Sequence, residues 1–329
     1  MNKSNPDSPQ LSVWRLDQIG KEQRRPSLFS KRGCPKGDKV RAKRTPIWPF
    51  AFFVLGISCL IGQTLVIREL IISFYGNELF SSLALGFWLL LVGMGSLLFS
   101  KLFQKTKPLP VVIISHVLIA LFLPLEIFLI RFVKIFTLPG QLPNFLPSIG
   151  ISFLILIPFC LVLGLFWTMA SKVYCQLKND FSLAITRAYF FETLGFVAAG
   201  LIFTFILISL NEFISIYLII TLNLMMALCL AFSAQRRAVF LKSLTIFCLI
   251  VFLFFSLSPF GQQIQKKILS LRFKSQILIE SINSKYGNIA VTQSQRKSSS
   301  LDPSGSVLDQ YNFFQNGLLI GSNQEKNFN

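Results

Sequence analysis

The 329-residue chain has few charged residues and only one histidine, His116. Charged side chains make up 14% of the chain, whereas soluble domains carry about 25%. The cysteines include no Cys-x-x-Cys pair, and with a single histidine they offer no metal-ligand spacing. These absences argue against a zinc site and against a disulfide framework. No metal and no cofactor is therefore expected.

Long polar stretches are also missing between residues 47 and 257. Hydrophobic residues make up 53% of the chain, and they are concentrated in long apolar blocks. A bilayer core about 30 Å thick takes about 20 helical residues, which is the approximate length of each block. A soluble helical bundle would need polar faces at helical spacing, and these blocks have none. The chain is therefore predicted to be an all-α polytopic membrane bundle.

Seven blocks have the length and composition of membrane spans. Their approximate bounds are 47–67, 80–99, 109–130, 149–169, 190–210, 213–232 and 239–257, and the first stays apolar through Phe74. We group them into one transmembrane domain over residues 47–258. The connection before Phe213 is very short, so the fifth and sixth spans should form a tight antiparallel pair.

The basic excess of the chain points to the bilayer and not to nucleic acid. Lysine and arginine number 32 against 14 acidic residues, and many of the basic ones lie in the arm 1–46, before the first span. A basic segment beside an apolar block follows the positive-inside rule and can also contact anionic lipid headgroups. The arm is polar and rich in Pro, Ser and Gly, so we expect it to be disordered and cytoplasmic. The predicted partner is the lipid bilayer, with no nucleic acid.

The charges in the loops support the same orientation but create a difficulty. Basic residues follow the second, fourth and sixth spans: Lys101, Lys105, Lys107, Lys172, Lys178, Arg236, Arg237 and Lys242. The opposite loops carry little besides Arg68, Arg131 and Lys134. Seven crossings would leave the C-terminal tail outside the cell. The alternatives are that one block does not cross fully, or that the first block contains a re-entrant turn.

The tail, residues 259–329, changes character. Residues 262–274 alternate basic and apolar positions at helical spacing, which predicts a helix along the membrane interface. Residues 287–293 alternate as a strand does, and Asn316-Gly317 lies between two apolar runs. Asn-Gly favours a two-residue hairpin turn because both central positions need positive φ. Three short strands are expected, with an open edge that can accept a strand from a partner.

Several polar residues lie within or beside the apolar blocks. The candidate intramembrane polar site contains Gln63, Arg68, Glu69, Glu126, Arg187 and Glu192. An ionisable group in hydrocarbon is costly, so it normally faces a partner or a water-filled cavity. One interpretation is a polar pathway or binding pocket in the centre of the bundle. The other is that these groups snorkel to the headgroups or form static ion pairs between helices.

Small residues predict where the helices pack closely. The candidates are Gly93, Gly95, Gly195 and Gly200. Glycine lets two helix backbones approach each other in lipid, where no hydrophobic force drives helices together. The expected role of these residues is helix packing.

Four stretches together resemble bacterial membrane proteins in which a transporter-like bundle is fused to a spermidine-synthase-like domain. They are GISCLIGQTLVIRELIISFYGNEL (56–79), GMGSLL (93–98), RAYFFETLGFVAAGL (187–201), and ESINSKYGNIAVTQSQ (280–295) with QYNFFQNGLLIGS (310–322). The resemblance implies a multi-pass protein of the bacterial inner membrane. It also implies that the tail corresponds to the N-terminal β-structure of an aminopropyltransferase.

The chain departs from this family where catalysis is concerned. Gly287 and Ile320 stand where the family's strand and hairpin carry glutamines that help to hold the substrates. The family's Gly-rich nucleotide-binding turn, ribose-binding acid and catalytic Asp have no counterpart in these 329 residues. The resemblance therefore implies a truncated member without aminopropyltransferase activity, with a separately encoded synthase-like domain as a partner. The alternatives are a transporter-like bundle that binds a small molecule, and a scaffold that binds a partner through the β-tail.

Overall fold

The computed structural model describes most of the chain from Ile47 onward. The described residues are 47–74, 77–103, 105–133, 145–178, 180–234, 239–270, 273, 276–284, 287–294 and 310–323. The N-terminal arm, which was expected to be disordered, lies outside these ranges. The long helices are α2 (Ile47–Ser73), α3 (Glu78–Leu102), α4 (Pro108–Val133), α5 (Phe145–Lys178), α6 (Phe181–Phe205), α7 (Glu212–Ser233) and α8 (Val239–Leu257).

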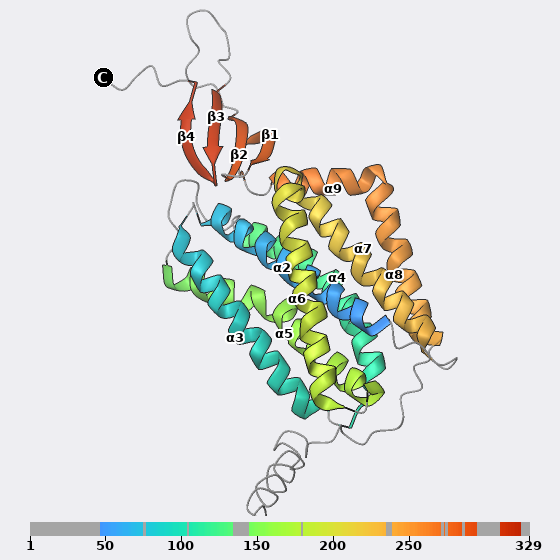
Figure 1. Cartoon of the computed structure of the whole chain (residues 1–329). Helices are drawn as coiled ribbons and strands as arrows, with labels where there is room; N and C mark the ends of the chain where they lie inside the picture. The colour runs from blue at the N-terminus through green and yellow to red at the C-terminus, as the bar shows by residue number, and fades with distance from the viewer. Residues whose placement is uncertain are drawn as a thin grey trace, which may run out of the picture.

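Seven helices in the described part of the chain are long and apolar enough to cross a membrane. They run alternately up and down, so that the end of α2, the end of α4 and the start of α7 lie at the same end of the bundle (Figure 1). The short helix α9 (Pro259–Ser270) lies across this end, as expected for an interfacial helix (Figure 1). The chain is thus a multi-pass membrane protein with an all-helical bundle.

The helix α2 is continuous, which rules out the re-entrant turn, one of the two alternatives raised by the loop charges. α2 is an unbroken helix of 27 residues and contains no re-entrant turn. All seven predicted spans are present as helices, so Ile47 and the C-terminal tail lie at opposite ends of the bundle (Figure 1).

The fifth span starts earlier than predicted. α6 begins at Phe181, about nine residues before the expected start, and ends at Phe205, before the short 3-10 helix Leu207–Ser209. Asp180 caps the helix by accepting a hydrogen bond from the backbone N–H of Leu183 at 3.1 Å. The polar residues after this cap are compatible with a helix that projects beyond the hydrocarbon, where headgroups and water solvate them.

Two close helix crossings contain glycine. A Cβ atom on Gly195 of α6 would lie 2.2 Å from the carbonyl oxygen of Phe53 on α2, and one on Gly95 of α3 would lie 2.7 Å from that of Leu161 on α5. The other two predicted packing glycines differ. Gly200 meets only a leucine methyl group at 3.5 Å, and Gly93 has nothing within 4 Å. The close contacts of α3 with α5 and of α6 with α2 therefore leave no room for a Cβ atom at Gly95 and Gly195, whereas a Cβ atom would fit at Gly93.

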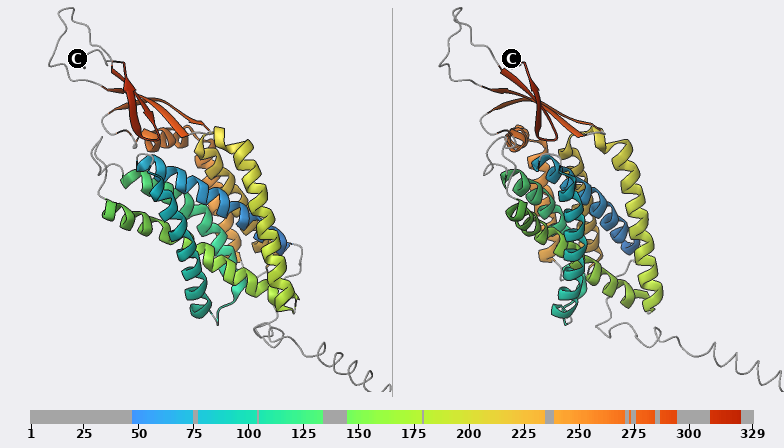
Figure 2. Two further views of the ribbon diagram at one scale, coloured as in Figure 1. Left: turned by 60° about the vertical axis from the view of Figure 1, so that its left-hand side comes forward. Right: turned by 90° about the vertical axis from the view of Figure 1, so that its left-hand side faces the viewer.

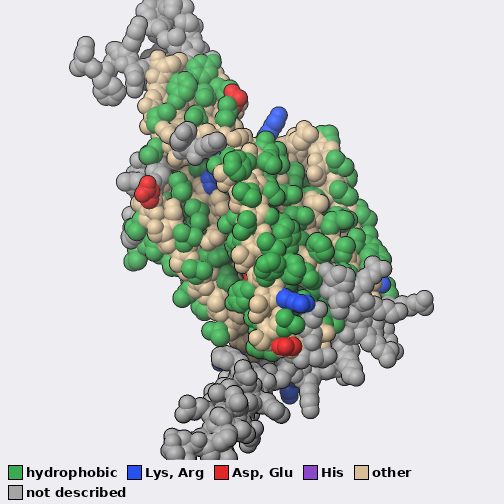
Figure 3. Space-filling view, in the orientation of Figure 1, with side chains coloured by type: hydrophobic (Ala, Val, Ile, Leu, Met, Phe, Trp, Pro, Cys, Tyr) green, Lys and Arg blue, Asp and Glu red, His purple; other side chains and the backbone are tan. Residues whose placement is uncertain are grey.

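Large apolar side chains cover the outside of the bundle. Leu89 and Leu97 on α3, Phe205 on α6 and Phe240 and Phe254 on α8 are each more than 60% exposed. Figure 3 shows hydrophobic side chains over most of the visible bundle surface. A soluble monomer rarely exposes a contiguous apolar surface of this extent, so the surrounding solvent is hydrocarbon.

A four-stranded antiparallel sheet stands at the α9 end of the bundle (Figures 1 and 2). Its strands follow the order of the chain: β1 (Ile277–Ser284), β2 (Gly287–Ser294), β3 (Gln310–Gln315) and β4 (Leu318–Ser322). The predicted hairpin turn joins β3 to β4, with φ of 49° at Asn316 and 81° at Gly317. The sheet has one strand more than expected. The pairing of β1 with β2 shifts register between Leu278 and Glu280, and this irregularity obscures its alternation in the sequence.

Candidate functional site

The guanidinium of Arg131 is fully buried and is the centre of a charged network. Its Nε donates to Oε2 of Glu69 at 3.0 Å, and its Nη2 donates to Oε1 of Glu69 at 2.7 Å. The same Nη2 donates to Oε1 of Glu212 at 2.6 Å. The ring of Phe213 lies 5.3 Å from the guanidinium carbon. One cation thus holds two carboxylates from two other helices.

The helix ends bring these three residues together. Glu69 is near the end of α2, Arg131 is near the end of α4, and Glu212 is the first residue of α7. Asn211 caps α7 by accepting a hydrogen bond from the N–H of Phe213 at 3.2 Å, which fixes the first turn that carries Glu212. A carboxylate in the first turn also interacts favourably with the helix dipole. All three positions lie at the sheet end of the bundle.

The network continues from the bundle into the sheet. Nδ2 of Asn283 in β1 donates to Oε2 of Glu212 at 2.7 Å, and Asn288 of β2 donates to Oδ1 of Asn283 at 2.8 Å. Beside it, Arg68 donates to the carbonyl oxygens of Ile208 and Ser284, both at 3.3 Å. Residues of α2 and α7 therefore bind the first strand through charge-assisted hydrogen bonds, which are stronger than neutral ones.

This network is suited to holding a structure in place. Removal of one partner from a buried ion pair typically costs about 3–5 kcal/mol, because the other charge stays buried without compensation. The bidentate contact of Arg131 with Glu69 also fixes the relative orientation of α4 and α2. The arrangement therefore defines where the sheet sits on the bundle.

A second, uncharged polar cluster lies inside the bundle. Nδ1 of His116 on α4 is 2.8 Å from Oδ1 of Asn223 on α7, and Nδ2 of Asn223 donates to Oγ of Ser58 on α2 at 2.7 Å. The ring of Phe166 packs edge-on against His116 at 4.6 Å. These bonds connect the same three helices, α2, α4 and α7, deeper in the bundle. They are compatible with a packed, hydrogen-bonded histidine.

Glu126 differs from the other acidic residues of the bundle. It is fully buried on α4, and neither carboxyl oxygen has a hydrogen-bond partner among the described residues. Glu126 does not join the Arg131 network, although it lies five residues before Arg131 on the same helix.

The remaining predicted site residues lie apart from the network. Oε2 of Glu192 on α6 accepts a hydrogen bond from the indole N–H of Trp167 at 2.7 Å. Arg187 is exposed on the same helix, and Gln63 is half-buried in α2. No ion pair joins Arg187 to Glu192, both of which the structure describes. The structure thus brings Arg68 and Glu69 together at the sheet, and it places Glu126 and Glu192 elsewhere.

The sequence analysis did not include Arg131 and Glu212 in the candidate site. Arg131 was counted among the few basic residues of the opposite loops, and Glu212 belongs to the segment before Phe213 that was interpreted only as a short connection. Both lie at helix ends on the same side of the bundle and have opposite charges. Once the direction of each span is assigned, the sequence places both residues at the same membrane face. That position could have predicted an ion pair between Arg131 and Glu212.

The described residues include no group of three or more His, Cys, Asp or Glu side chains that could hold a metal ion. Among the described cysteines, Cys59, Cys160, Cys229 and Cys248 are free thiols, and Cys175 is disulfide-bonded. The fold and the network together define a class: a multi-pass membrane protein whose bundle binds its own small β-sheet at one end. No family model, no curated protein and no solved structure matches this chain.

Proposed function

We propose that this chain is the membrane module of a spermidine-synthase-like protein. In this proposal the bundle holds the β-sheet at one membrane face as a platform for a synthase-like domain, and the chain itself transfers no aminopropyl group. The observation that carries the proposal is the buried network that connects Glu69, Arg131 and Glu212 to Asn283 of the sheet.

The contacts of the structure support this proposal because they link the stretches that carry the family resemblance. Arg68 and Glu69 belong to the first stretch, and Asn283 and Ser284 belong to the last. Arg68 binds the backbone of Ser284 directly. The third stretch contains Gly195, which packs against the first stretch near Gly56. Residues that resemble one family in order and spacing thus also meet in space.

The sheet has an apolar face that suits a platform. Ile282, Ile289, Phe313 and Leu318 are each between 40% and 54% exposed. Ile282 is opposite Ile289 in the β1–β2 ladder, so these side chains lie on one face of the sheet. A small sheet needs a cover on its apolar face for independent stability, and a synthase-like domain would supply one.

The proposed orientation places the arm in the cytoplasm and the sheet on the other side of the membrane. The basic residues Lys101, Lys105, Lys107, Lys172 and Lys242 lie in or near the connections at the end opposite the sheet, and together with the basic arm they support the positive-inside assignment. The sheet end carries fewer, including Lys266 and Lys267 on α9.

Two measurements test the proposal. The DNA that adjoins the coding sequence should encode a Gly-rich nucleotide-binding segment, in the same frame or a shifted one. The full chain, purified in detergent with decarboxylated S-adenosylmethionine and putrescine, should form no spermidine. Absence of such a segment would remove the support for a synthase partner, and spermidine formation would contradict the inactive module.

A transporter-like bundle is the second candidate function, and Glu126 is the observation that favours it. A buried carboxyl group without a partner inside a membrane bundle marks a functional position in many transporters. Glu126→Gln should then abolish uptake of a solute by proteoliposomes. Glu192→Gln is the matched control, since Glu192 already has a partner in Trp167. Equal uptake by the wild type and Glu126→Gln across a broad solute panel would contradict this candidate.

A further inference from the structure

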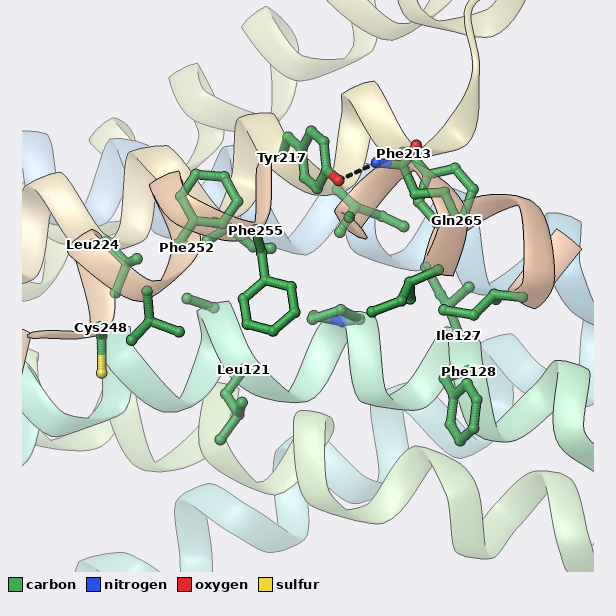
Figure 4. Close-up of a pocket in the computed structure, with 18 of the residues that line it drawn as sticks. Leu121, Ile127, Phe128, Phe213, Tyr217, Leu224, Cys248, Phe252, Phe255 and Gln265 are labelled. Carbon is green, nitrogen blue, oxygen red and sulfur yellow. Dashed lines mark hydrogen bonds between the residues drawn. The ribbon is translucent and has the colours of Figure 1, made fainter. Parts of the chain in front are cut away.

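A cavity of about 450 Å³ lies between α4, α7, α8 and α9 (Figure 4). Its volume falls within the range of about 300–1,000 Å³ that is typical of small-molecule sites. Leucine, isoleucine, valine and phenylalanine side chains form most of its wall. The lining residues Leu121 on α4 and Phe247 and Phe255 on α8 are between 41% and 64% exposed, so the cavity opens toward the bilayer.

The cavity is polar at one end and apolar at the other. Gln265 of α9 donates a hydrogen bond to the hydroxyl of Tyr217, and both lie at the same end as Phe213 (Figure 4). Leu224 and Cys248 lie at the other end (Figure 4). Leu224 is eleven residues beyond Phe213 on α7, which places it about 16 Å deeper in the membrane. The polar end is therefore at the membrane surface, and the apolar end is inside the hydrocarbon.

Arg131 also lines this cavity, at the end where α4 approaches α9. Its Nη1 has no hydrogen-bond partner among the described residues, whereas its Nε and Nη2 bind Glu69 and Glu212. The guanidinium is fully buried, so the polar groups that a ligand in the cavity can reach at this end are the uncharged side chains of Tyr217 and Gln265. An uncharged oxygen can form hydrogen bonds with both without leaving a charge unpaired.

We propose that this cavity binds a single unbranched hydrocarbon chain that carries an uncharged oxygen head. The chain lies along the apolar wall toward Leu224, and the oxygen lies near Tyr217 and Gln265. A long-chain alcohol and an ester-linked chain of a glycerolipid both have this chemistry. A polyamine does not, because its buried ammonium groups would need acidic partners that the apolar wall does not provide. The site is therefore independent of the proposed synthase partnership.

Photolabelling of the full chain in phosphatidylcholine vesicles tests this proposal. The two probes are hexadecanol and phosphatidylcholine, each with a diazirine on the hydrocarbon chain. One or both should label peptides of α4, α7 and α8 that line the cavity, and unlabelled hexadecanol should compete in a saturable manner. Labelling by the alcohol alone identifies a free long-chain ligand, and labelling by the phospholipid identifies an ester-linked chain. Either result supports the site.

A pair of neighbouring variants separates the cavity from the general lipid surface. Val251→Trp fills the cavity, because Val251 lines it. Ile250→Trp is the matched control, because Ile250 is 60% exposed and is not part of the lining. Labelling should fall about tenfold in Val251→Trp, which corresponds to about 1.4 kcal/mol of binding, and stay unchanged in Ile250→Trp. Labelling that does not saturate, or that is equal in both variants, would overturn the proposal.

The polar end is tested by the double variant Gln265→Leu with Tyr217→Phe. It should weaken competition by hexadecanol, while competition by hexadecane, which has no oxygen, stays the same. Equal competition by the two compounds in the wild-type chain would contradict the assigned role of the polar end.

Discussion

Arg131 combines complete burial with two ionic partners. Its guanidinium is fully buried, yet it bonds two carboxylates that are 62 and 81 residues away in the chain. Loss of the cation would leave two acidic groups close together in a low-dielectric interior. The stability of the sheet end therefore depends more on Arg131 than on either glutamate alone.

The substitution Arg131→Met should lower the free energy of unfolding by about 3–5 kcal/mol, because both carboxylates lose their counter-charge. Thermal unfolding of the purified chain in detergent is the measurement. Glu212→Gln should cost less, since the bidentate pair of Arg131 with Glu69 remains. The exposed Arg187→Met is the control and should stay within about 0.5 kcal/mol of the wild type. A comparable loss in Arg187→Met would show that the network has no special role.

The contact between Asn283 and Glu212 leads to a separate expectation for the sheet. Asn283→Ala removes the direct bond from β1 to α7, so amide hydrogens of β1 should exchange faster while those of α4 and α7 keep their protection. Hydrogen exchange followed by mass spectrometry measures this difference. The control is Gln315→Ala, because Gln315 is exposed on β3. Unchanged exchange in β1 would mean that other contacts hold the sheet.

At the scale of helices and strands, the sequence predicted what depends on local composition. The seven spans follow from apolar blocks long enough to cross hydrocarbon, and the β3–β4 turn follows from Asn316-Gly317. The predicted start of the fifth span was too late, because the first turns of α6 contain polar residues. Such a composition is as typical of a loop as of a helix. The strand β1 was not expected, since an irregularity near Leu278 breaks its alternation.

The candidate site was less predictable for a physical reason. The partners of Arg131 come from helices that are far apart in the sequence, and their pairing depends on the level at which each helix ends. From the sequence, Glu69 and Glu126 are equally good candidates for an intramembrane polar site. Of the two, only Glu69 has a cationic partner in the structure. The different environments of the two carboxyl groups therefore follow from helix packing and cannot be predicted from the local sequence.

The crossing of α2 and α6 gives a prediction for a single element pair. Gly195→Ala should destabilise the bundle by about 1–3 kcal/mol, because a Cβ would overlap the carbonyl oxygen of Phe53 and push the helices apart. Gly93→Ala is the matched control, since nothing lies within 4 Å of its Cβ position. The midpoint of thermal unfolding should fall only in the first variant. A drop of equal size in Gly93→Ala would remove the distinction.

At the scale of the whole molecule, the seven spans among the described residues fix a relation between Ile47 and the sheet. Ile47 and the sheet lie at opposite ends of the bundle (Figure 1). Whatever the orientation of the bundle, the arm and the sheet should therefore face different compartments. Only one of them can face the cytoplasm.

Reporter fusions measure this relation directly. A reporter in the arm before Ile47 and one in the connection around Lys105 should give the same compartment, and one after Asn323 should give the other. With the proposed orientation, the first two are cytoplasmic. The same compartment for the arm and the tail would contradict seven crossings.

The attachment of the sheet has a mechanical consequence. The covalent path from α7 to β1 runs through α8 and α9, but Asn283 returns to Glu212 at the start of α7, 71 residues earlier in the chain. The segment between Glu212 and Asn283 therefore forms a loop that is closed by the hydrogen bond between these two residues. If a protease cut this segment after α9, the hydrogen bonds to Glu212 and Arg68 would keep the sheet on the bundle. The outer helix α8 could then shift in the bilayer without carrying the sheet along.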